Sequence, residues 1–326
     1  MKLATLKTRG RDGRLGLVHR NLSCAVWADD PYSTLQNALD HWDDAQGLLR
    51  TKYDLLLAGR ADGAFAFDPN MAAAPLPRSY QWLDGSAFHS HGELMSRVFK
   101  IEPPNSDRPL MYQGLSHEFL GARDDVVLPS EADGIDFEGE FGIITDAVPM
   151  GVDARQAETH VKLIVQINDW SLRTIGPIEM RTGFGWVQAK PACSVAPIAV
   201  TPDELGPAWQ NGRVALPLHV WWNGQHFGAA NGLAMGFSFF ELVAHAARTR
   251  ALCAGTIIGS GTVSNENYRE IGSSCIAERR AIELMDLGES KTAYMRFGDT
   301  VRMAATVASG EAPFGVIDQR VVEYRP

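Results

Sequence analysis

The chain has 326 residues, of which 45% are hydrophobic and 21% are charged, and its formal net charge is −9. This is the composition of a globular protein, and the acidic excess argues against nucleic acid or an anionic membrane as a partner, because both attract Lys and Arg. No apolar run reaches the ~18 residues of a membrane span, and we expect no secretory signal at the start of the chain. Four cysteines without C-x-x-C spacing favour reduced thiols in a cytoplasm and argue against a zinc–thiolate site.

The first part of the chain is predicted to form a small N-terminal unit. Short strands separated by Gly-containing turns are expected over residues 1–28. A helix is expected over residues 31–59, with a Ser-Thr pair as its cap and Gly59 at its end, because its apolar residues share one face. Three prolines then mark a boundary. The predicted domains are residues 1–75 and residues 76–326.

The larger domain reads as strand-like runs separated by Gly and Pro turns, with two helices. The helices are expected over 153–164 and 238–250, where a capping residue is followed by Gln or Glu three positions later. An Asn-Gly pair within residues 214–232 predicts a hairpin, and 298–306 and 315–324 look like closing strands. There is no serial βαβ pattern and no Gly-rich nucleotide-binding loop, so a nucleotide cofactor has no support.

An acidic alternation occurs in the segment GIDFEGEFGIIT, residues 134–145. Asp136, Glu138 and Glu140 occupy every second position, so a single β-strand would place the three carboxylates on one face. Like charges repel and cannot all be buried without compensation. Two interpretations remain open: the face is exposed, as on an edge strand, or a positive group lies over it. In the second case Glu138 and Glu140 would suit a hard divalent cation.

Two other acidic residues occur in settings that allow a structural or a ligand role. Asp169 ends an apolar run in VQINDWSLRTIG, where an acid serves as a turn cap or as a buried ligand. Asp84 precedes a glycine and, taken alone, is typical of a turn. His91 follows Asp84 by seven positions, and His89 is the competing histidine, on the same face if the segment is extended. The other histidines are interpreted as surface or hydrogen-bonded structural residues.

Five stretches in order, D-F-E-G-E-F, N-D-W-S-L-R, A-K-P, G-S-G-T-V-S and G-S-S-C-I-A-E, resemble the fumarylacetoacetate hydrolase family over about residues 78–322. The resemblance implies an α+β, β-rich fold, with a mixed β-sandwich or roll as catalytic domain and a small SH3-like N-terminal domain. It also implies one divalent ion per subunit, Mg²⁺ or Ca²⁺, held by four carboxylates. The residues that match these ligands are Asp84, Glu138, Glu140 and Asp169. Asp136 is expected to lie outside this set.

The resemblance also implies roles around the ion. His91 matches the family's water-activating base, and Glu278 matches the carboxylate that orients it, a pairing that lets imidazole take a proton from water. Lys190 and Arg173 match cations near a developing oxyanion, and fixed charges of this kind supply a large catalytic term. The residues that match substrate contacts are Tyr112 and Thr262.

Departures from the family pattern lie near the substrate end of the expected site. Members that cleave fumarylacetoacetate carry Gln seven residues after the Asp of N-D-x-S, where this chain has Gly176. The loop between Thr262 and Glu278 is longer than in those members, and the N-terminal unit is shorter. These differences bear on the substrate more than on the metal.

The resemblance implies a metal-dependent hydrolase that cleaves a carbon–carbon bond of a β-diketone acid. The expected substrate is fumarylacetoacetate, cleaved to fumarate and acetoacetate in the catabolism of tyrosine. Acylpyruvate hydrolysis, hydration of 2-oxo-4-enoates and oxaloacetate decarboxylation remain alternatives on the same fold. A non-catalytic sensor of small acids would need neither the base nor the lysine, and both are present. We expect a small diketo or oxo acid as ligand, a homodimer as is common in the family, and a cytoplasmic location.

Overall fold

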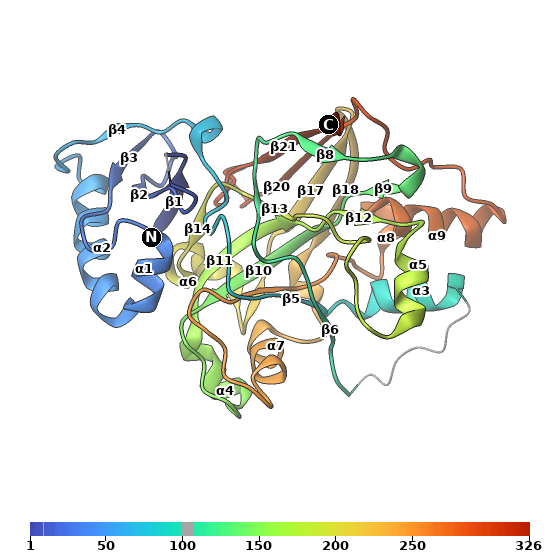
Figure 1. Ribbon diagram of the computed structural model, residues 1–326, viewed down its shortest axis with the longest axis horizontal. Helices are drawn as coiled ribbons and strands as arrows, with labels where there is room; N and C mark the ends of the chain where they lie inside the picture. The colour runs from blue at the N-terminus through green and yellow to red at the C-terminus, as the bar shows by residue number, and fades with distance from the viewer. Residues whose placement is uncertain (9, 100–106) are drawn as a thin grey trace.

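The computed structural model describes residues 1–8, 10–99 and 107–326. A twelve-stranded, mainly antiparallel sheet runs from the N-terminal part through the centre of the molecule (Figure 1). A five-stranded sheet and two isolated strand pairs complete the β structure of the described residues, and helices lie around them. The predicted β-rich α+β class is confirmed. Among the described residues, no helix has the length and apolarity needed to cross a membrane.

The strands of the large sheet come from the N-terminal part and the middle of the chain, between residues 2 and 259. In spatial order its main path is β4 (Phe65–Ala66), β3 (Cys24–Trp27), β2 (Arg14–Val18), β1 (Lys2–Leu6), β14 (Ala199–Val200), β11 (Val161–Asn168), β10 (Gly139–Thr145), β19 (Ile257–Gly259), β5 (Trp82–Ser86) and β6 (Leu110–Gln113). Off this path, β13 (Ser194–Val195) pairs with β11 and with β7 (Leu120–Gly121).

The smaller sheet and the strand pairs come from the larger domain. The five-stranded sheet has the order β18 (Gln225–Asn231), β17 (Pro217–Trp222), β20 (Thr300–Ala305), β21 (Ile317–Glu323) and β8 (Val126–Leu128). The pairs are β12 (Ser171–Leu172) with β9 (Ile135–Asp136), and β15 (Trp209–Gln210) with β16 (Arg213–Val214).

The α-helices of the described residues are mostly short. They are α1 (Leu35–Asp40), α2 (Trp42–Leu57), α3 (His89–Phe99), α4 (Ala154–Ala157), α5 (Gly176–Thr182), α6 (Pro202–Leu205), α7 (Phe239–Ala246), α8 (Tyr268–Ile271) and α9 (Ile276–Leu287). Single 3-10 turns occur at Pro69–Met71, Glu131–Asp133, Glu158–His160, Gly206–Ala208 and Gly232–Ala234.

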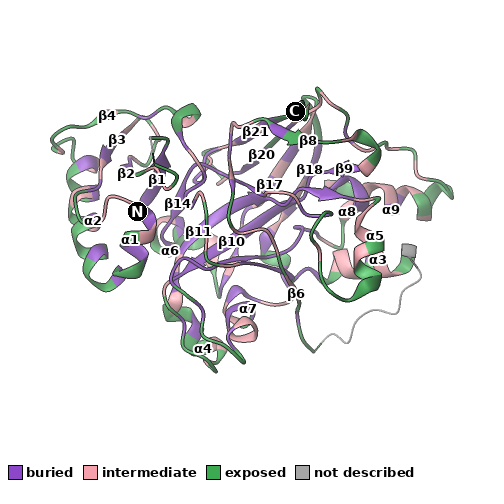
Figure 2. Cartoon of the chain, in the orientation of Figure 1, coloured by how far each residue is buried: buried purple, intermediate pink, exposed green. Residues whose placement is uncertain are grey.

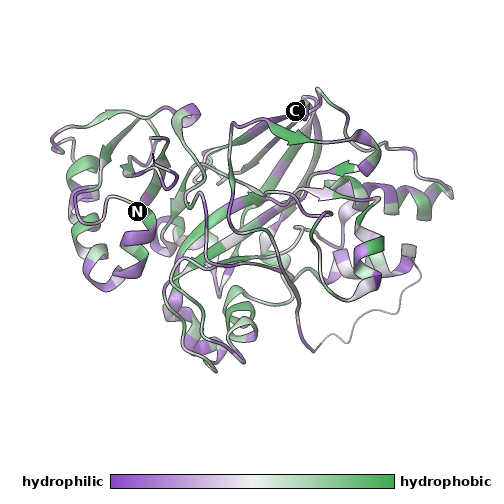
Figure 3. Ribbon diagram, in the orientation of Figure 1, coloured by the Kyte–Doolittle hydropathy of each residue, from purple (hydrophilic) through white to green (hydrophobic). Residues whose placement is uncertain are grey.

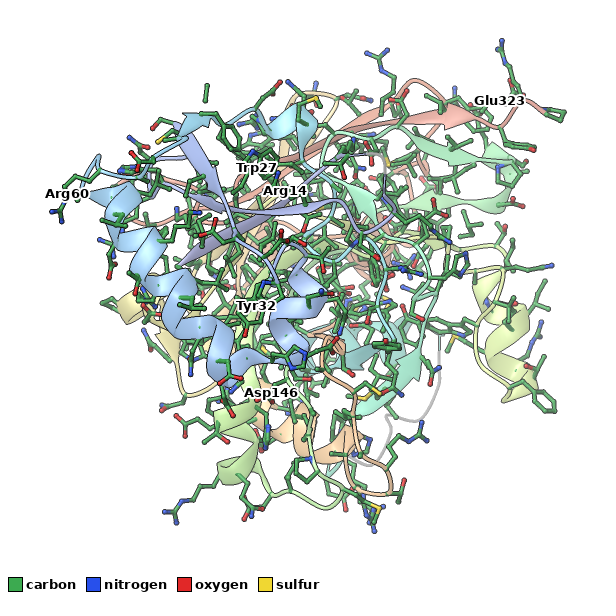
Figure 4. The ribbon with its side chains drawn as sticks, turned by 60° about the vertical axis from the view of Figure 1, so that its left-hand side comes forward. Arg14, Trp27, Tyr32, Arg60, Asp146 and Glu323 are labelled. Carbon is green, nitrogen blue, oxygen red and sulfur yellow. The ribbon has the colours of Figure 1, made fainter. Side chains whose placement is uncertain are left out.

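The N-terminal strands β1 to β4 form an antiparallel meander that joins the large sheet through the pairing of β1 with β14. The short strands predicted for residues 1–28 are confirmed, and the guanidinium of Arg14 lies 4.8 Å above the ring of Trp27 on this meander (Figure 4). The predicted helix is two helices, because the chain breaks at His41 (φ −132°), and Thr34 caps the first of them. The SH3-like description and the boundary at residue 75 stay predictions.

The helix predicted over 153–164 is wrong beyond its first turn. The capping box of Asp153 and Gln156 is present, with bonds of 2.9 and 2.7 Å, but α4 ends at Ala157. A 3-10 turn follows at Glu158–His160, and the chain then enters β11, which pairs with β10 along its length. Its alternating, β-branched apolar residues gain more from this buried pairing than from a helix, so tertiary context overrides the local cap.

Other predicted elements are confirmed. Ser238 and Glu241 form a capping box at the start of α7, a helix coloured largely hydrophobic in Figure 3. The predicted hairpin is β17–β18, and its turn residues Asn223 and Gly224 both have positive φ (50° and 76°), as a type I′ turn requires. The closing strands are β20 and β21. Helices α3, α5, α6, α8 and α9 were not predicted.

The two sheets meet over a common core that buries the central strands. Every residue of β10 is buried, and all but one of β11 (Figure 2). Gln166 on β11 ties the sheets together, because its side chain donates to Met303 O at 3.2 Å and accepts from the N–H of Ala305 at 2.7 Å, both on β20. Acidic residues at one end of β10 and β11 are therefore held inside the protein.

Candidate metal centre and active site

Three carboxylates from separate parts of the chain meet inside the large sheet. Asp84 lies on β5, Glu140 on β10 and Asp169 directly after β11, and each offers an oxygen within 4.8 Å of those offered by the other two. All three residues are buried. Their strands are neighbours, because β19 pairs with both β5 and β10, and β10 pairs with β11. The structure thus brings together three of the four predicted ligands.

The approach of Asp84 to this centre depends on a glycine in the intervening strand. Gly259 is paired in register with Asp84, and a Cβ on Gly259 would lie 2.3 Å from Asp84 Oδ1. The backbone N–H of Gly261 donates to the same oxygen at 3.0 Å. A side chain at position 259 would displace the Asp84 carboxylate. The first glycine of the G-S-G-T-V-S stretch is therefore required for steric reasons.

The cluster carries more negative charge than the described protein groups compensate. Burial raises the pKa of Glu140 well above its usual range, and the charges of Asp84 and Asp169 raise it further. Burial and Asp169 likewise raise the pKa of Asp84, although Lys190 opposes them. Within the described residues, neither carboxylate oxygen of Glu140 has a hydrogen-bond partner. Buried carboxylates with free oxygens fit a hard divalent cation such as Mg²⁺, Ca²⁺ or Mn²⁺.

Glu138, the fourth predicted ligand, is bound by protein donors. Its Oε1 accepts from Ser171 at 2.5 Å and Lys190 at 3.0 Å, and its Oε2 accepts from Thr262 at 2.6 Å. Arg173 Nη2 lies 2.7 Å from Oε1. Burial opposes ionisation, but the charges of Arg173 and Lys190 hold the pKa of Glu138 well below its usual range. Its place in a ligand set stays a prediction.

The acidic stretch is not one continuous strand, which corrects the reading of residues 134–145. β9 ends at Asp136 and β10 begins at Gly139. The Asp136 carboxylate instead lies at the start of α9, where it accepts the N–H groups of Ile276 and Ala277 at 2.7 and 2.9 Å, and Arg173 Nε donates to it at 2.8 Å. All three acidic residues of the stretch are buried, so the exposed-face interpretation is wrong.

Asp169 is the most heavily bonded member of the cluster. Lys190 Nζ and the Tyr112 hydroxyl donate to its Oδ2 at 2.6 and 2.5 Å, and the Cys193 thiol donates to its Oδ1 at 2.8 Å. Burial disfavours the charged lysine, but Asp169 and Glu138 raise the pKa of Lys190 above its usual value. The lysine is therefore a fixed cation beside the carboxylates, and Tyr112 lies next to it.

The predicted base and its partner face each other between two packed helices. His91 on α3 has its Nδ1 3.5 Å from Oε1 of Glu278 on α9. Ser264 Oγ donates to the same Oε1 at 2.5 Å and accepts from Ser90 Oγ at 3.0 Å. Apolar contacts of Leu94 with α9 hold the helices together. Glu278 is fully buried and His91 is partly exposed, so the imidazole can reach both the carboxylate and water.

His89 is separated from His91 by the helical geometry of this segment. The two histidines would share a face only if the segment were extended, but it forms α3, and residues two apart on a helix do not share a face. The ring of His89 packs against that of Phe237, with centroids 5.3 Å apart. The His91–Glu278 pair is linked to the carboxylates through one loop, since Thr262 bonds Glu138 and Ser264, two residues later, bonds Glu278.

Five polar or aromatic side chains of the site were missed in the sequence. They are Ser90, Ser171, Trp186, Cys193 and Ser264. Each lies within four positions of a residue that was predicted, and that proximity is the signal that could have found them. Their residue types are too common to indicate a role without the fold.

A cavity of about 540 Å³ lies elsewhere in the molecule. It is lined mainly by β18, α8 and α9, with His226, Tyr268, Arg269 and Arg279 among the contributing side chains. None of the predicted site residues contributes to it, and its two arginines already have partners in Asp286 and the Phe227 carbonyl. The carboxylate cluster remains the centre of interest.

Curated proteins resemble this chain over about half of its length. The chain is 28% identical over 162 residues (49% of this chain, 54% of the other) to 2,4-didehydro-3-deoxy-L-rhamnonate hydrolase of Sphingomonas sp. (strain SKA58). It is 24% identical over 162 residues (49% of each) to the mitochondrial oxaloacetate tautomerase FAHD2B of Homo sapiens. These matches span about half the length of the curated relatives.

The fold is shared with solved structures over the whole chain. The maleylpyruvate hydrolase of Sphingobium sp. SYK-6, in complex with manganese(II) and pyruvate, superposes with a TM-score of 0.67 at 18% identity, with full coverage of both chains. The sequence profile described as fumarylacetoacetate (FAA) hydrolase C-terminal matches residues 81–322, and the one described as fumarylacetoacetase N-terminal domain 2 matches residues 1–78. This chain therefore belongs to the fumarylacetoacetate hydrolase family.

Proposed function

We propose that the protein is a metal-dependent hydrolase that cleaves a carbon–carbon bond of a β-diketone acid. The observation that carries the proposal is the buried cluster of Asp84, Glu140 and Asp169, in which the Glu140 oxygens have no partner among the described residues. Burying three carboxylates close together costs folding free energy, and a bound cation would offset that cost. The His91–Glu278 pair and Lys190 lie on segments joined to the same cluster.

Asp84, Glu140 and Asp169, with Glu138 as the proposed fourth ligand, would hold one Mg²⁺, Ca²⁺ or Mn²⁺. Manganese and pyruvate occur together in the structurally similar maleylpyruvate hydrolase, which supports both a divalent ion and an oxo-acid ligand here. When bound, such an ion supplies Lewis-acid polarisation of the substrate's oxygen atoms.

His91 acts as the general base in this proposal. Glu278 faces Nδ1, so Nε2 is the nitrogen left to take a proton from water, and the carboxylate stabilises the imidazolium that results. The water oxygen adds to the carbonyl carbon, and the adjacent carbon–carbon bond then breaks. The electron pair of that bond leaves with the second fragment as an enolate, and the proton that His91 took from water returns to the α-carbon of this enolate to give a neutral ketone. One water is consumed and two acids are formed.

Lys190 and Arg173 supply positive charge on the side where negative charge develops. Lys190 is nearly fully buried, and both cations are fixed by Glu138, so little reorganisation is needed when the oxyanion forms. Tyr112 is fixed as well, by its bond to Asp169. Thr262 has its hydroxyl on Glu138, so we propose that its first role is to orient that carboxylate and that substrate contact is secondary.

Fumarylacetoacetate is the substrate that the family resemblance favours. Gly176, in place of the glutamine of fumarylacetoacetate-cleaving members, favours an acylpyruvate as a second candidate of the same class. The relatives named above include hydrolases and a tautomerase, so an oxo-acid tautomerase or decarboxylase is the competing reaction. Both need the ion and the lysine, but neither consumes water.

The test is to incubate the Mg²⁺-loaded protein separately with fumarylacetoacetate, acetylpyruvate, maleylpyruvate and oxaloacetate, and to identify the products by chromatography. Our proposal expects two acids from at least one diketo acid, and loss of that activity in His91→Ala with Mg²⁺ binding unchanged. Carbon dioxide or a tautomer as the sole product, or full activity in His91→Ala, would contradict hydrolysis by this base.

We also propose a homodimer in the cytoplasm, as is common in the family. All four cysteines, Cys24, Cys193, Cys253 and Cys275, are free thiols, which suits a reducing compartment. Light scattering of the purified protein tests the dimer, and its localisation by microscopy tests the compartment.

A further inference from the structure

An aromatic pair packs against the lysine of the site. The rings of Tyr112 and Trp186 are 4.8 Å apart, and Lys190 Nζ lies 5.4 Å from the first and 5.3 Å from the second. Tyr112 is fixed, because it lies on β6 opposite Asp84 and bonds Asp169. Trp186 has no such anchor among the described residues: its contact with the site is through its ring alone.

Trp186 lies in the segment 183–189, which follows α5, a helix that projects from the body of the molecule at the right of Figure 4. Gly183 and Gly185 precede Trp186 with φ of 72° and 98°, and a Cβ on either would meet nothing within 4 Å. The base of the segment is held, because the carboxylate of Glu179 accepts the N–H groups of residues 187 to 189 at 3.0 to 3.1 Å. The segment therefore has a free tip and a fixed base.

Only one of the large apolar side chains at this tip turns toward the site. Phe184 is 97% exposed and Val187 is 83% exposed, whereas Trp186 is half-buried against Tyr112 and Lys190. The contact of Trp186 with the site is therefore specific to this side chain, since the other large apolar side chains of the segment face solvent.

We propose that Trp186 is a specificity-determining residue that, with Tyr112, forms an aromatic wall for the tail of the oxo acid, the part beyond its 2-oxo-carboxylate head. The proposal rests on the function proposed above. Lys190 and Arg173 provide positive charge for the 2-oxo-carboxylate head, and the ammonium group of Lys190 lies within 5.4 Å of both rings of this wall. The tail then meets two ring faces, which favour a planar, unsaturated or aryl group over a short alkyl group.

The test uses two saturated 2-oxo acids that lack the 4-carbonyl group and so cannot be cleaved. 2-Oxobutanoate and 2-oxo-4-phenylbutanoate share the head and differ by the phenyl ring. Their dissociation constants are measured by calorimetry on the Mg²⁺-loaded protein, for the natural chain, Trp186→Ala, Trp186→Phe and Phe184→Ala. Phe184→Ala is the matched control, because it removes a ring from the same segment that faces solvent.

We expect the phenyl compound to bind the natural chain about tenfold more tightly than 2-oxobutanoate, and this ratio to fall to about one in Trp186→Ala. Trp186→Phe and Phe184→Ala should keep most of the ratio, and the affinity for 2-oxobutanoate should be unchanged throughout. The proposed aromatic wall would be contradicted if the ratio of the two dissociation constants were unchanged in Trp186→Ala. It would also be contradicted if both compounds lost affinity equally in that variant, or if neither compound bound the natural chain. Failure of the proposed hydrolysis would instead appear as absent turnover with the ratio intact.

Discussion

Two glutamates in the same acidic stretch, two positions apart, have opposite surroundings. Glu138 accepts hydrogen bonds from Ser171, Lys190 and Thr262, and its pKa is held low by Arg173 and Lys190 in spite of burial. Glu140 is equally buried, its oxygens have no partner among the described residues, and burial and neighbouring acids raise its pKa. The fold supplies counter-charges for one carboxylate and leaves the other for a ligand.

Within one motif, this contrast separates a carboxylate that protein groups already compensate from one that the described protein groups leave uncompensated. A buried carboxylate that is fully bonded contributes to the stability of the fold, and removing it leaves its cations unpaired. A buried carboxylate without partners costs stability until something binds it. A buried carboxylate without partners therefore indicates a binding site more strongly than a fully bonded one does. In a sequence motif the two are the same residue type and cannot be told apart. The following experiments test this difference.

Removal of divalent ions should have the largest effect. In excess EDTA we expect turnover of the best diketo acid to disappear, because no protein group replaces the Lewis acid. Adding back Mg²⁺ or Mn²⁺ in excess over the chelator should restore it. Kinetics before and after dialysis measure this, and full activity in EDTA would refute a metal-dependent mechanism.

Glu140→Gln should weaken metal binding at least about 100-fold, since loss of even a supporting partner of a metal site costs 10- to 100-fold. In metal-free buffer at neutral pH the same change should stabilise the protein by about 1–2 kcal/mol, because burial and the neighbouring acids raise the pKa of Glu140 and so penalise its ionisation in the folded state, whereas glutamine does not ionise. Calorimetry with Mn²⁺ gives the first quantity and urea unfolding gives the second. Destabilisation in metal-free buffer would show that Glu140 has a protein partner after all.

Glu138→Gln should destabilise the metal-free protein, whereas Glu140→Gln should stabilise it. The Glu138 substitution leaves Arg173 and Lys190 without their shared carboxylate, and breaking a buried pair in this way costs about 3–5 kcal/mol. Urea unfolding under the conditions used for Glu140→Gln measures the difference directly. If both variants changed the free energy of unfolding in the same direction, the contrast between Glu138 and Glu140 would be contradicted.

Thr262→Val should have the smallest effect. It removes one hydroxyl donor from Glu138 while keeping the side-chain shape, so the expected loss of stability is about 1 kcal/mol. Metal affinity should fall only severalfold, and KM should change little if the hydroxyl serves Glu138. A large increase in KM without loss of stability would instead assign Thr262 to substrate contact.

The sequence predicted the residues of the site better than their surroundings. Asp84, Glu140 and Asp169 were identified from motifs, and the structure brings them together. The resemblance could not show that Glu138 is compensated by Arg173, because that depends on the break between β9 and β10. Alternation of acids suggested a single strand, whereas Asp136 turns away to the start of α9.

The fold was predicted where local signals and tertiary contacts agree. The Asn223–Gly224 hairpin and the capping box of α7 needed only local geometry. The cap at Asp153 was real, but the strand pairing of β11 with β10 ended its helix after one turn. Helix α9 was missed because its cap is Cys275, a residue that rarely signals a helix start, and Trp186 was missed because only contacts across the fold place it at the site.

The most direct test of the central claim is a crystal structure grown with Mn²⁺ and analysed by anomalous diffraction at the manganese edge. We predict one anomalous peak per subunit at bonding distance from the carboxylate oxygens of Asp84, Glu140 and Asp169. The absence of a peak between these residues, with ample Mn²⁺ in the crystal, would contradict the proposed metal centre.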